Sequence, residues 1–253
     1  MAVIAGADGA SAVRLGVAMT GLQASIGALN DLVDAPHDRG HKPGKPIPAG
    51  LVSPGLASLV VVAAGALGLA SSLPSGLGLV ALAAIVLAVG YAYDLLFKGT
   101  AWSWVPFAVG IPLLPVFGWL GTTTSLPTPF AVLLPVAVVA GAGLAIANAS
   151  ADAERDAAAG VDSVAVRLGP RRAWLTSSGL LAVVVAAAIV TLAAGGAAPG
   201  PIAAEIGSAF VIGLGVVVGR DASSARRERA WELEAVGVGL LAAAWLSGVP
   251  LGR

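Results

Sequence analysis

Eight apolar stretches of about 20 residues constrain the fold of this chain more than any other feature of its sequence. A helix of that length crosses the roughly 30 Å hydrocarbon core of a bilayer. The stretches are continuously apolar rather than alternating, so they favour helices over the strands of a barrel. The sequence therefore predicts an all-α, polytopic membrane helix bundle that forms one domain over residues 1–253. About eight transmembrane helices are expected, at residues 11–33, 51–72, 77–97, 104–123, 129–150, 173–194, 201–219 and 232–251.

One polar motif occurs twice, each time at the end of an apolar stretch. Its pattern is N-x3-D-x3-D, in a chain of which only 11% of the residues are charged. An aspartate deep in a bilayer costs about 2.5–3.5 kcal/mol, so two clusters of them indicate that cations and water gather there. The first copy has an additional aspartate directly after its asparagine. The copies consist of Asn30, Asp31, Asp34 and Asp38, and of Asn148, Asp152 and Asp156.

The basic residues predict on which side of the membrane these motifs lie. All but two of the 14 lysines and arginines fall in the loops on the motif side, and the exceptions are Arg14 and Arg253. By the positive-inside rule this side is cytoplasmic, and we expect the chain in a bacterial cell membrane. Four spans separate the motifs, so the two motif-bearing halves run parallel. The net charge is zero, which gives no support to nucleic-acid binding.

The spacing of the acids indicates a site for a divalent cation. On a helix, Asp31, Asp34 and Asp38 lie within about 60° of one another, and Asp152 and Asp156 are i, i+4 neighbours. Such clusters repel unless a cation relieves them. The chain has no cysteine, and oxygen ligands suit a hard ion such as Mg²⁺, which binds one or two carboxylates together with phosphate oxygens. Two such sites would clamp a diphosphate.

Neighbouring residues qualify this prediction. A proline at position 36 is expected to end or kink the first motif helix before Asp38. Lys45, Lys98 and Arg155 are candidates to neutralise phosphate, whereas the arginines near residue 225 are expected only to set topology. Tryptophans 102, 104, 174 and 231 are expected to anchor the membrane interface. The remaining acids are expected to be ordinary solvated residues, namely Asp94, Glu154, Asp162, Asp221, Glu228, Glu232 and Glu234.

Two longer segments resemble the signatures of the UbiA superfamily of intramembrane prenyltransferases. The segment Asn30–Gly50, NDLVDAPHDRGHKPGKPIPAG, resembles the first signature, and Asp152–Gly169, DAERDAAAGVDSVAVRLG, resembles the second. The segment Tyr93–Gly99 is similar to the family's intervening Tyr/Lys loop. Three features depart from the family. Lys45 stands where an arginine is usual, Asp94 holds the usual tyrosine position, and eight spans replace nine, so that the first helix is expected to be missing.

The resemblance implies a helix bundle around a central cavity and an enzyme that uses Mg²⁺. Two ions, bridging the substrate diphosphate, would be bound by the five motif aspartates, and Asn30 and Asn148 would orient metal or diphosphate. Lys45, Lys98 and Arg155 would neutralise the leaving group. The implied reaction transfers an isoprenyl group, through an allylic carbocation, from an isoprenyl diphosphate to an aromatic, quinone-precursor-like acceptor in the membrane.

Other functions remain open at this point. A second enzyme hypothesis changes only the acceptor, to a phosphosugar or a glycerol-phosphate lipid. A membrane transporter also has internal repeats and intramembrane acids, although its sites tend to lie near the bilayer midplane. A non-catalytic scaffold that binds isoprenoid and Mg²⁺ without turnover is the third possibility.

Overall fold

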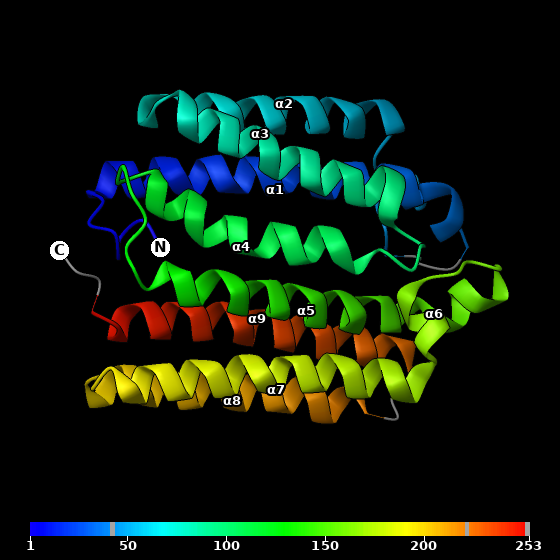
Figure 1. Cartoon of the computed structure of the whole chain (residues 1–253). Coiled ribbons are helices and arrows are strands. Elements are labelled where there is room, and N and C mark those ends of the chain that lie inside the picture. Colours follow the sequence, from blue (N-terminus) through cyan, green and yellow to red (C-terminus); the bar gives the residue numbers. More distant parts are fainter. Residues whose placement is uncertain (41–43, 221–222, 251–253) are drawn as a thin grey trace. The chain divides into compact units, whose positions relative to one another are not determined.

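The predicted all-α fold is confirmed by a computed structural model, which describes residues 1–40, 44–220 and 223–250. Lys42, part of the basic loop after the first motif, lies outside these residues. Within them, the regular secondary structure is entirely helical (Figure 1). The elements are α1 (Gly9–Asp38), α2 (Pro54–Ser72), η1 (Leu73–Ser75), α3 (Leu77–Ala92), η2 (Tyr93–Phe97), α4 (Trp104–Leu120), α5 (Phe130–Ala158), α6 (Val164–Leu168), α7 (Pro170–Ala194), α8 (Pro199–Gly219) and α9 (Ser224–Gly248).

Seven of the described helices are long and apolar enough to cross a membrane, by length and composition. They are α1, α2 with η1, α3 with η2, α5, α7, α8 and α9. The remaining predicted span, residues 104–123, is instead the 17-residue helix α4. At 1.5 Å per residue α4 is about 26 Å long, slightly less than the hydrocarbon core. The motif helices extend beyond the predicted spans because their polar ends remain helical.

The helices form two compact units. The first unit contains Met1–Leu96 and Leu113–Ser125, and the second contains Phe97–Pro112 and Leu126–Arg253. The boundary therefore falls inside α4, directly after Pro112. Each unit carries one copy of the aspartate motif. The single domain and the central cavity stay predictions.

In the first unit, α1 packs against α2 and α3 (Figure 1). The helix α1 begins at Gly9 because the side chain of Asp8 accepts a hydrogen bond from the backbone N–H of Ser11, at 2.8 Å. Its buried side chains, among them Leu22, join Ala83 of α3 and Phe117 in one apolar core. Small residues permit this close packing, as is usual between membrane helices.

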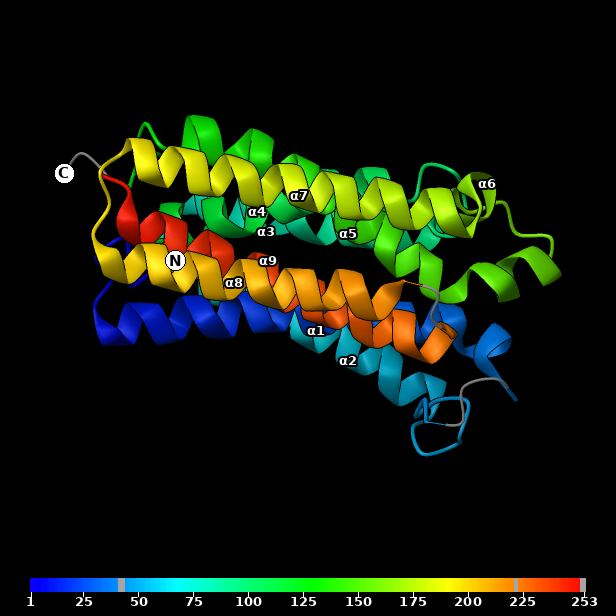
Figure 2. The same ribbon diagram turned by 90° about the horizontal axis from the view of Figure 1, so that it is seen from below.

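In the second unit, α5 packs against α7 and α9, and α8 packs along α9. Figure 2 shows α7 and α8 running back along one another after the turn near Gly196. Glycines again bring the backbones together. A Cβ atom at Gly215 of α8 would lie 2.8 Å from the carbonyl oxygen of Ala230 in α9. The long helix α5, which carries the second motif, is held in place by α7 and α9.

Replacing Gly141 by alanine is expected to destabilise the second unit. A Cβ atom at this position of α5 would lie 2.3 Å from the backbone oxygen of Phe107, and backbone cannot yield as a flexible side chain can. Overpacking typically costs about 1–3 kcal/mol, which corresponds to a fall in Tm of about 2–12 °C for a chain of this size. Thermal unfolding of the purified protein in detergent measures the change.

A matched control is Gly179→Ala in α7, where a Cβ atom meets nothing within 4 Å. Since alanine is the better helix former, this variant should unfold at the wild-type temperature or slightly above it. Equal Tm values for Gly141→Ala and the wild type would contradict the close approach of α5 to Phe107.

Candidate functional site

The first motif occupies the last turns of α1. The helix continues through Pro36 and ends at Asp38, with Arg39 as its C-cap. The expectation that Pro36 ends the helix before Asp38 is therefore wrong. Pro36 lies within the last turn of α1, where the fixed φ of proline, about −65°, is compatible with a helix. Consequently Asp31, Asp34 and Asp38 lie on one helix, as their spacing predicts.

A lysine from the following loop pairs with this helix end. The Nζ of Lys45 donates a hydrogen bond to Oδ1 of Asp31, and both side chains are partly exposed. Burial alone would lower the pKa of Lys45, but its hydrogen bond and ion pair with Asp31 outweigh that effect. Asp38 and Asp34 add further attraction, so the pKa of Lys45 is raised above its ordinary value. Lys45 therefore remains charged beside the first motif.

The asparagine of the first motif contacts an acid that the sequence predicts to be solvated. The Nδ2 of Asn30 donates a hydrogen bond of 2.8 Å to Oδ1 of Asp94. Asp94 is only 4% exposed, so its assignment as an ordinary solvated acid is wrong. It lies in η2, a single π-helical turn of the kind that recurs at functional sites. A lone acid inside the apolar run YDLLF was the available signal.

The second motif lies on α5, which ends two residues after Asp156. Arg155 forms an ion pair with Asp152 at i, i+3, and the two side chains are equally exposed, at 39%. The cation of this motif thus comes from the motif helix itself. In both units, then, one motif carboxylate is held by a cation that the sequence predicted nearby.

The loop that carries Lys98 lies beside the end of the second motif. Gly99 adopts a φ of +72°, and a Cβ atom there would lie 3.1 Å from Cγ1 of Val161. Val161 follows Asp156 closely, and its backbone N–H donates to the carbonyl oxygen of Asp156, at 2.8 Å. The backbone next to Lys98 therefore lies close to the chain segment that leaves the second motif.

An exposed ion pair follows in the same segment. The Nε of Arg167 donates a hydrogen bond of 2.9 Å to Asp162, which lowers the pKa of that carboxyl group. Both side chains are well exposed, which agrees with the expectation that Asp162 is solvated. This pair joins the loop after α5, which contains Asp162, to the helix α6, which contains Arg167.

The N-terminal end of α9 supports the second motif helix from another side. The hydroxyl group of Ser224 donates a hydrogen bond to the carbonyl oxygen of Ala151, and Arg227 pairs with Glu154. The sequence predicts that Arg227 only sets topology. In the structure its side chain is 15% exposed and contacts α5 through Glu154. Nothing in the local sequence indicates this contact, because its partners are 73 residues apart.

The predicted site residues thus fall into two sets. The first unit holds Asn30, Asp31, Asp34, Asp38 and Lys45, and the second holds Lys98, Asn148, Asp152, Arg155 and Asp156. Over residues 1–40, 44–220 and 223–250, the Asp, Glu and His side chains form no group of three or more that could hold a metal ion unaided. Mg²⁺ commonly needs only one or two carboxylates, with water and phosphate oxygens completing its shell. The predicted metal ligands and catalytic roles stay predictions.

Comparison with known proteins gives the family and the fold. The model of the UbiA prenyltransferase family matches residues 1–245. Among solved structures, a UbiA homolog from Aeropyrum pernix K1 in its apo form superimposes with a TM-score of 0.79 at 21% identity, covering 96% of this chain and 92% of that one. A UbiA homolog from Archaeoglobus fulgidus, bound to GPP and Mg²⁺, gives 0.64 at 21% identity, covering 95% and 89%.

A third solved structure is described as a digeranylgeranylglyceryl phosphate synthase in membranes. It gives a TM-score of 0.68 at 16% identity, covering 98% of this chain and 91% of that one. No curated protein sequence matches the chain. At these identities the solved structures establish the shared fold, and the family model establishes the family.

Proposed function

The chain belongs to the UbiA prenyltransferase family, and from this premise we propose that it transfers an isoprenyl group from an isoprenyl diphosphate to an aromatic, lipophilic acceptor. The family and the seven apolar helices make the chain an integral membrane protein. The observation that carries the proposal is the family match over residues 1–245, which spans both aspartate motifs. We place the motifs on the cytoplasmic side, where the positive-inside rule puts their basic loops.

The donor set of the motifs fits Mg²⁺. Its members are carboxylate and amide oxygens, without the thiolates that softer metals prefer. Each motif is proposed to hold one ion, so that two ions serve the diphosphate. The first would be held by Asp31, Asp34 and Asp38, and the second by Asp152 and Asp156. When bound, Mg²⁺ supplies positive charge that neutralises the diphosphate and favours its departure.

The cations of this chain would contribute to the same step. Lys45, Lys98 and Arg155 are proposed to bind oxygens of the diphosphate and to stabilise its charge as the carbon–oxygen bond breaks. Lys45 and Arg155 pair with Asp31 and Asp152. These ion pairs reduce the repulsion among the motif carboxylates. Asn30 and Asn148 would orient the ions or the diphosphate.

The apolar helix walls would protect the reaction from water. Loss of diphosphate leaves an allylic carbocation, which water would trap as an alcohol. An acceptor carbon on an aromatic ring would form the new bond instead and then lose its proton. The chain's acids and arginines are concentrated at the helix ends, so the membrane-embedded surfaces offer the carbocation few nucleophiles.

One observation favours a second candidate acceptor. The structure described as a digeranylgeranylglyceryl phosphate synthase shares the fold, with a TM-score of 0.68. A glycerol-phosphate lipid, whose hydroxyl oxygen would attack in place of the ring carbon, is therefore the alternative acceptor for this chain. A transporter or a non-catalytic scaffold has no comparable support.

A transfer assay with purified protein in nanodiscs tests the function and separates the acceptors. Radiolabelled geranyl, farnesyl and geranylgeranyl diphosphates are supplied with Mg²⁺ and either hydroxybenzoate- and naphthoate-type acids or glycerol-phosphate lipids. We expect a labelled lipid product only with the aromatic acids. Product only with the glycerol-phosphate lipids would establish the alternative acceptor. Diphosphate binding without any product would indicate the scaffold.

A further inference from the structure

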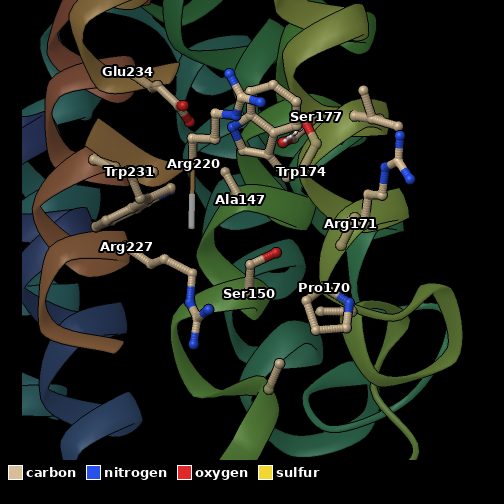
Figure 3. A pocket seen from close by; sticks show the side chains of 16 residues that line it. Ala147, Ser150, Pro170, Arg171, Trp174, Ser177, Arg220, Arg227, Trp231 and Glu234 are labelled. Carbon is tan, nitrogen blue, oxygen red and sulfur yellow. Dashed lines mark hydrogen bonds between the residues drawn. The ribbon is translucent and has the colours of Figure 1, made fainter. Parts of the chain in front are cut away.

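A pocket of about 530 Å³ lies within the second unit, and none of the predicted site residues lines it. It is formed where α5 and α8 approach their C-terminal ends and α7 and α9 begin. Figure 3 shows that its walls carry both large aromatic rings and charged groups. The side chains that matter for its chemistry are Arg171, Trp174, Arg220, Arg227, Trp231 and Glu234.

The pocket and the second aspartate motif use opposite faces of α5. The residues of α5 that line the pocket are Ala147, Ser150 and Ala153. At 100° per residue, their mean direction differs by about 160° from that of the motif positions 148, 152 and 156. The pocket is therefore separate from the second aspartate motif.

The walls of the pocket are rich in positive charge. Arg171, Arg220 and Arg227 come from the start of α7, the end of α8 and the first turns of α9. The guanidinium group of Arg220 lies 5.8 Å from the ring centre of Trp174, which holds it by a cation–π contact. Arg227 is 15% exposed, and its Nη2 pairs with Glu154. Figure 3 shows Arg220 and Arg227 at two different levels of the pocket.

Three polar atoms in these walls have unused hydrogen-bonding capacity. Among the described residues, Nε of Arg227, Nε1 of Trp231 and Oε2 of Glu234 are buried without a hydrogen-bond partner. Such groups are rare in folded proteins because each loses its bonds to water. Two of them are donors and the third belongs to a carboxyl group. These three groups would be satisfied by a ligand that has hydrogen-bond acceptors and at least one hydrogen-bond donor.

Glu234 is the most buried of these groups. It is 4% exposed, so its assignment as an ordinary solvated acid is wrong. Its Cγ lies where Gly215 leaves room, since a Cβ atom at that glycine would be 2.7 Å away. In Figure 3 its carboxyl group points into the pocket. A buried carboxyl group in a pocket that arginines also line suits a ligand that carries a donor next to an anionic group.

From these groups we infer that the pocket binds the headgroup of a membrane phospholipid whose phosphodiester is followed by a hydrogen-bond donor. Arg220 and Arg227 bind the phosphate oxygens, and the indole N–H of Trp231 donates to another oxygen. Glu234 accepts from the terminal ammonium of ethanolamine or from a hydroxyl group of glycerol. Basic pockets between membrane helices are suited to lipid headgroups.

The position of the pocket favours a lipid over a soluble phosphate compound. The membrane-spanning helices α7 and α9 begin here and α8 ends here, so the pocket lies near the level of the headgroups. Trp174 and Trp231 are of the residue type that is enriched at this level. A lipid can therefore place its phosphate in the pocket while its acyl chains remain in the bilayer.

Native mass spectrometry of the delipidated full-length protein tests the inference. It measures lipid binding directly and does not depend on prenyl-transfer activity. Phosphatidylethanolamine, phosphatidylglycerol and phosphatidylcholine are titrated separately. We expect one tightly bound molecule of either of the first two lipids. Phosphatidylcholine, which has no donor for Glu234, should bind on the order of tenfold more weakly. Arg220→Ala and Trp231→Phe should each weaken the preferred lipids, with the arginine change reaching on the order of tenfold.

Matched controls come from the same helix end. Arg226→Ala and Arg229→Ala remove exposed arginines of α9 that do not line the pocket, and both should bind lipid as the wild type does. Trp231→Phe keeps the aromatic ring, so it provides a test even if the arginine variant fails to fold. Unchanged lipid binding by both Arg220→Ala and Trp231→Phe would overturn the inference.

A second arm distinguishes a lipid from a soluble ligand. Glycerophosphoethanolamine, glycerophosphoglycerol and inorganic phosphate are added at the lipid concentrations that saturate the pocket. We expect none of them to displace the lipid. Displacement by any of them at equal concentration would overturn the lipid assignment and leave a soluble phosphate compound as the occupant.

Discussion

Asp34→Asn is expected to lower the rate of prenyl transfer by on the order of a thousandfold, because on the proposed function it removes the negative charge of a metal ligand where diphosphate charge must be neutralised. The substitution preserves the size of the side chain and leaves α1 intact, so the protein should remain folded. Asp152→Asn in the second motif should have an effect of similar size. Initial rates with Mg²⁺ and saturating isoprenyl diphosphate measure both variants.

The control uses the same substitution at the other end of the same helix. Asp8 caps α1, and asparagine is an equally good N-cap, so Asp8→Asn should retain wild-type activity and Tm. Wild-type rates for Asp34→Asn, in a preparation with unchanged thermal unfolding, would rule out the proposed role of the first motif. A loss of activity confined to one motif would show that one ion is sufficient.

Removal of Mg²⁺ is expected to abolish transfer entirely. Without the metal, the departing diphosphate retains charge that lysines and arginines alone cannot neutralise, and the motif acids repel it. EDTA should stop product formation, and excess Mg²⁺ should restore it. Ca²⁺ should restore little, because it is larger and prefers more ligands and looser geometry than a diphosphate site for Mg²⁺ provides.

EDTA that has been saturated with Mg²⁺ beforehand is the control for direct effects of the chelator. Binding of a non-hydrolysable isoprenyl diphosphate analogue, followed by calorimetry, should weaken in parallel with turnover. Full activity in metal-free buffer, verified by elemental analysis, would refute metal-dependent ionisation and would leave the cations Lys45, Lys98 and Arg155 as the sole counter-charges.

The sequence was sufficient for the helical architecture because apolar length and charge position are local properties. Even so, α4 differs from its prediction. Pro106, Pro112 and Pro115 lie within it, and only 17 residues between Trp104 and Leu120 are helical. The ends of α1 and α5 also differ, since hydropathy marks where a membrane span ends and not where a helix does. Asp38 and Asp156 remain helical beyond the apolar runs.

Contacts between distant residues were beyond prediction. Glu234 looks like an ordinary acid near a helix end, and only tertiary packing shows that it is 4% exposed. The partner of Asp94 is Asn30, which is 64 residues away, and no periodicity links the two positions. The sequence predicted Lys45 and Arg155 as cations near the motifs, and each lies within 14 residues of the motif acid that it pairs with, although the pairs themselves were not predicted.

Lys45 and Arg155 are connected to their carboxylate partners by different kinds of chain segment. This difference affects how each unit would tolerate an insertion or deletion near its motif. Lys45 reaches Asp31 from a loop, 14 residues along the chain. A residue gained in that loop costs little, because loop closure depends only weakly on length. Arg155 is three positions from Asp152 on one helix, and a single insertion between them would swing the arginine by about 100°. We therefore expect a one-residue insertion to disturb the ion pair of the second motif more than that of the first.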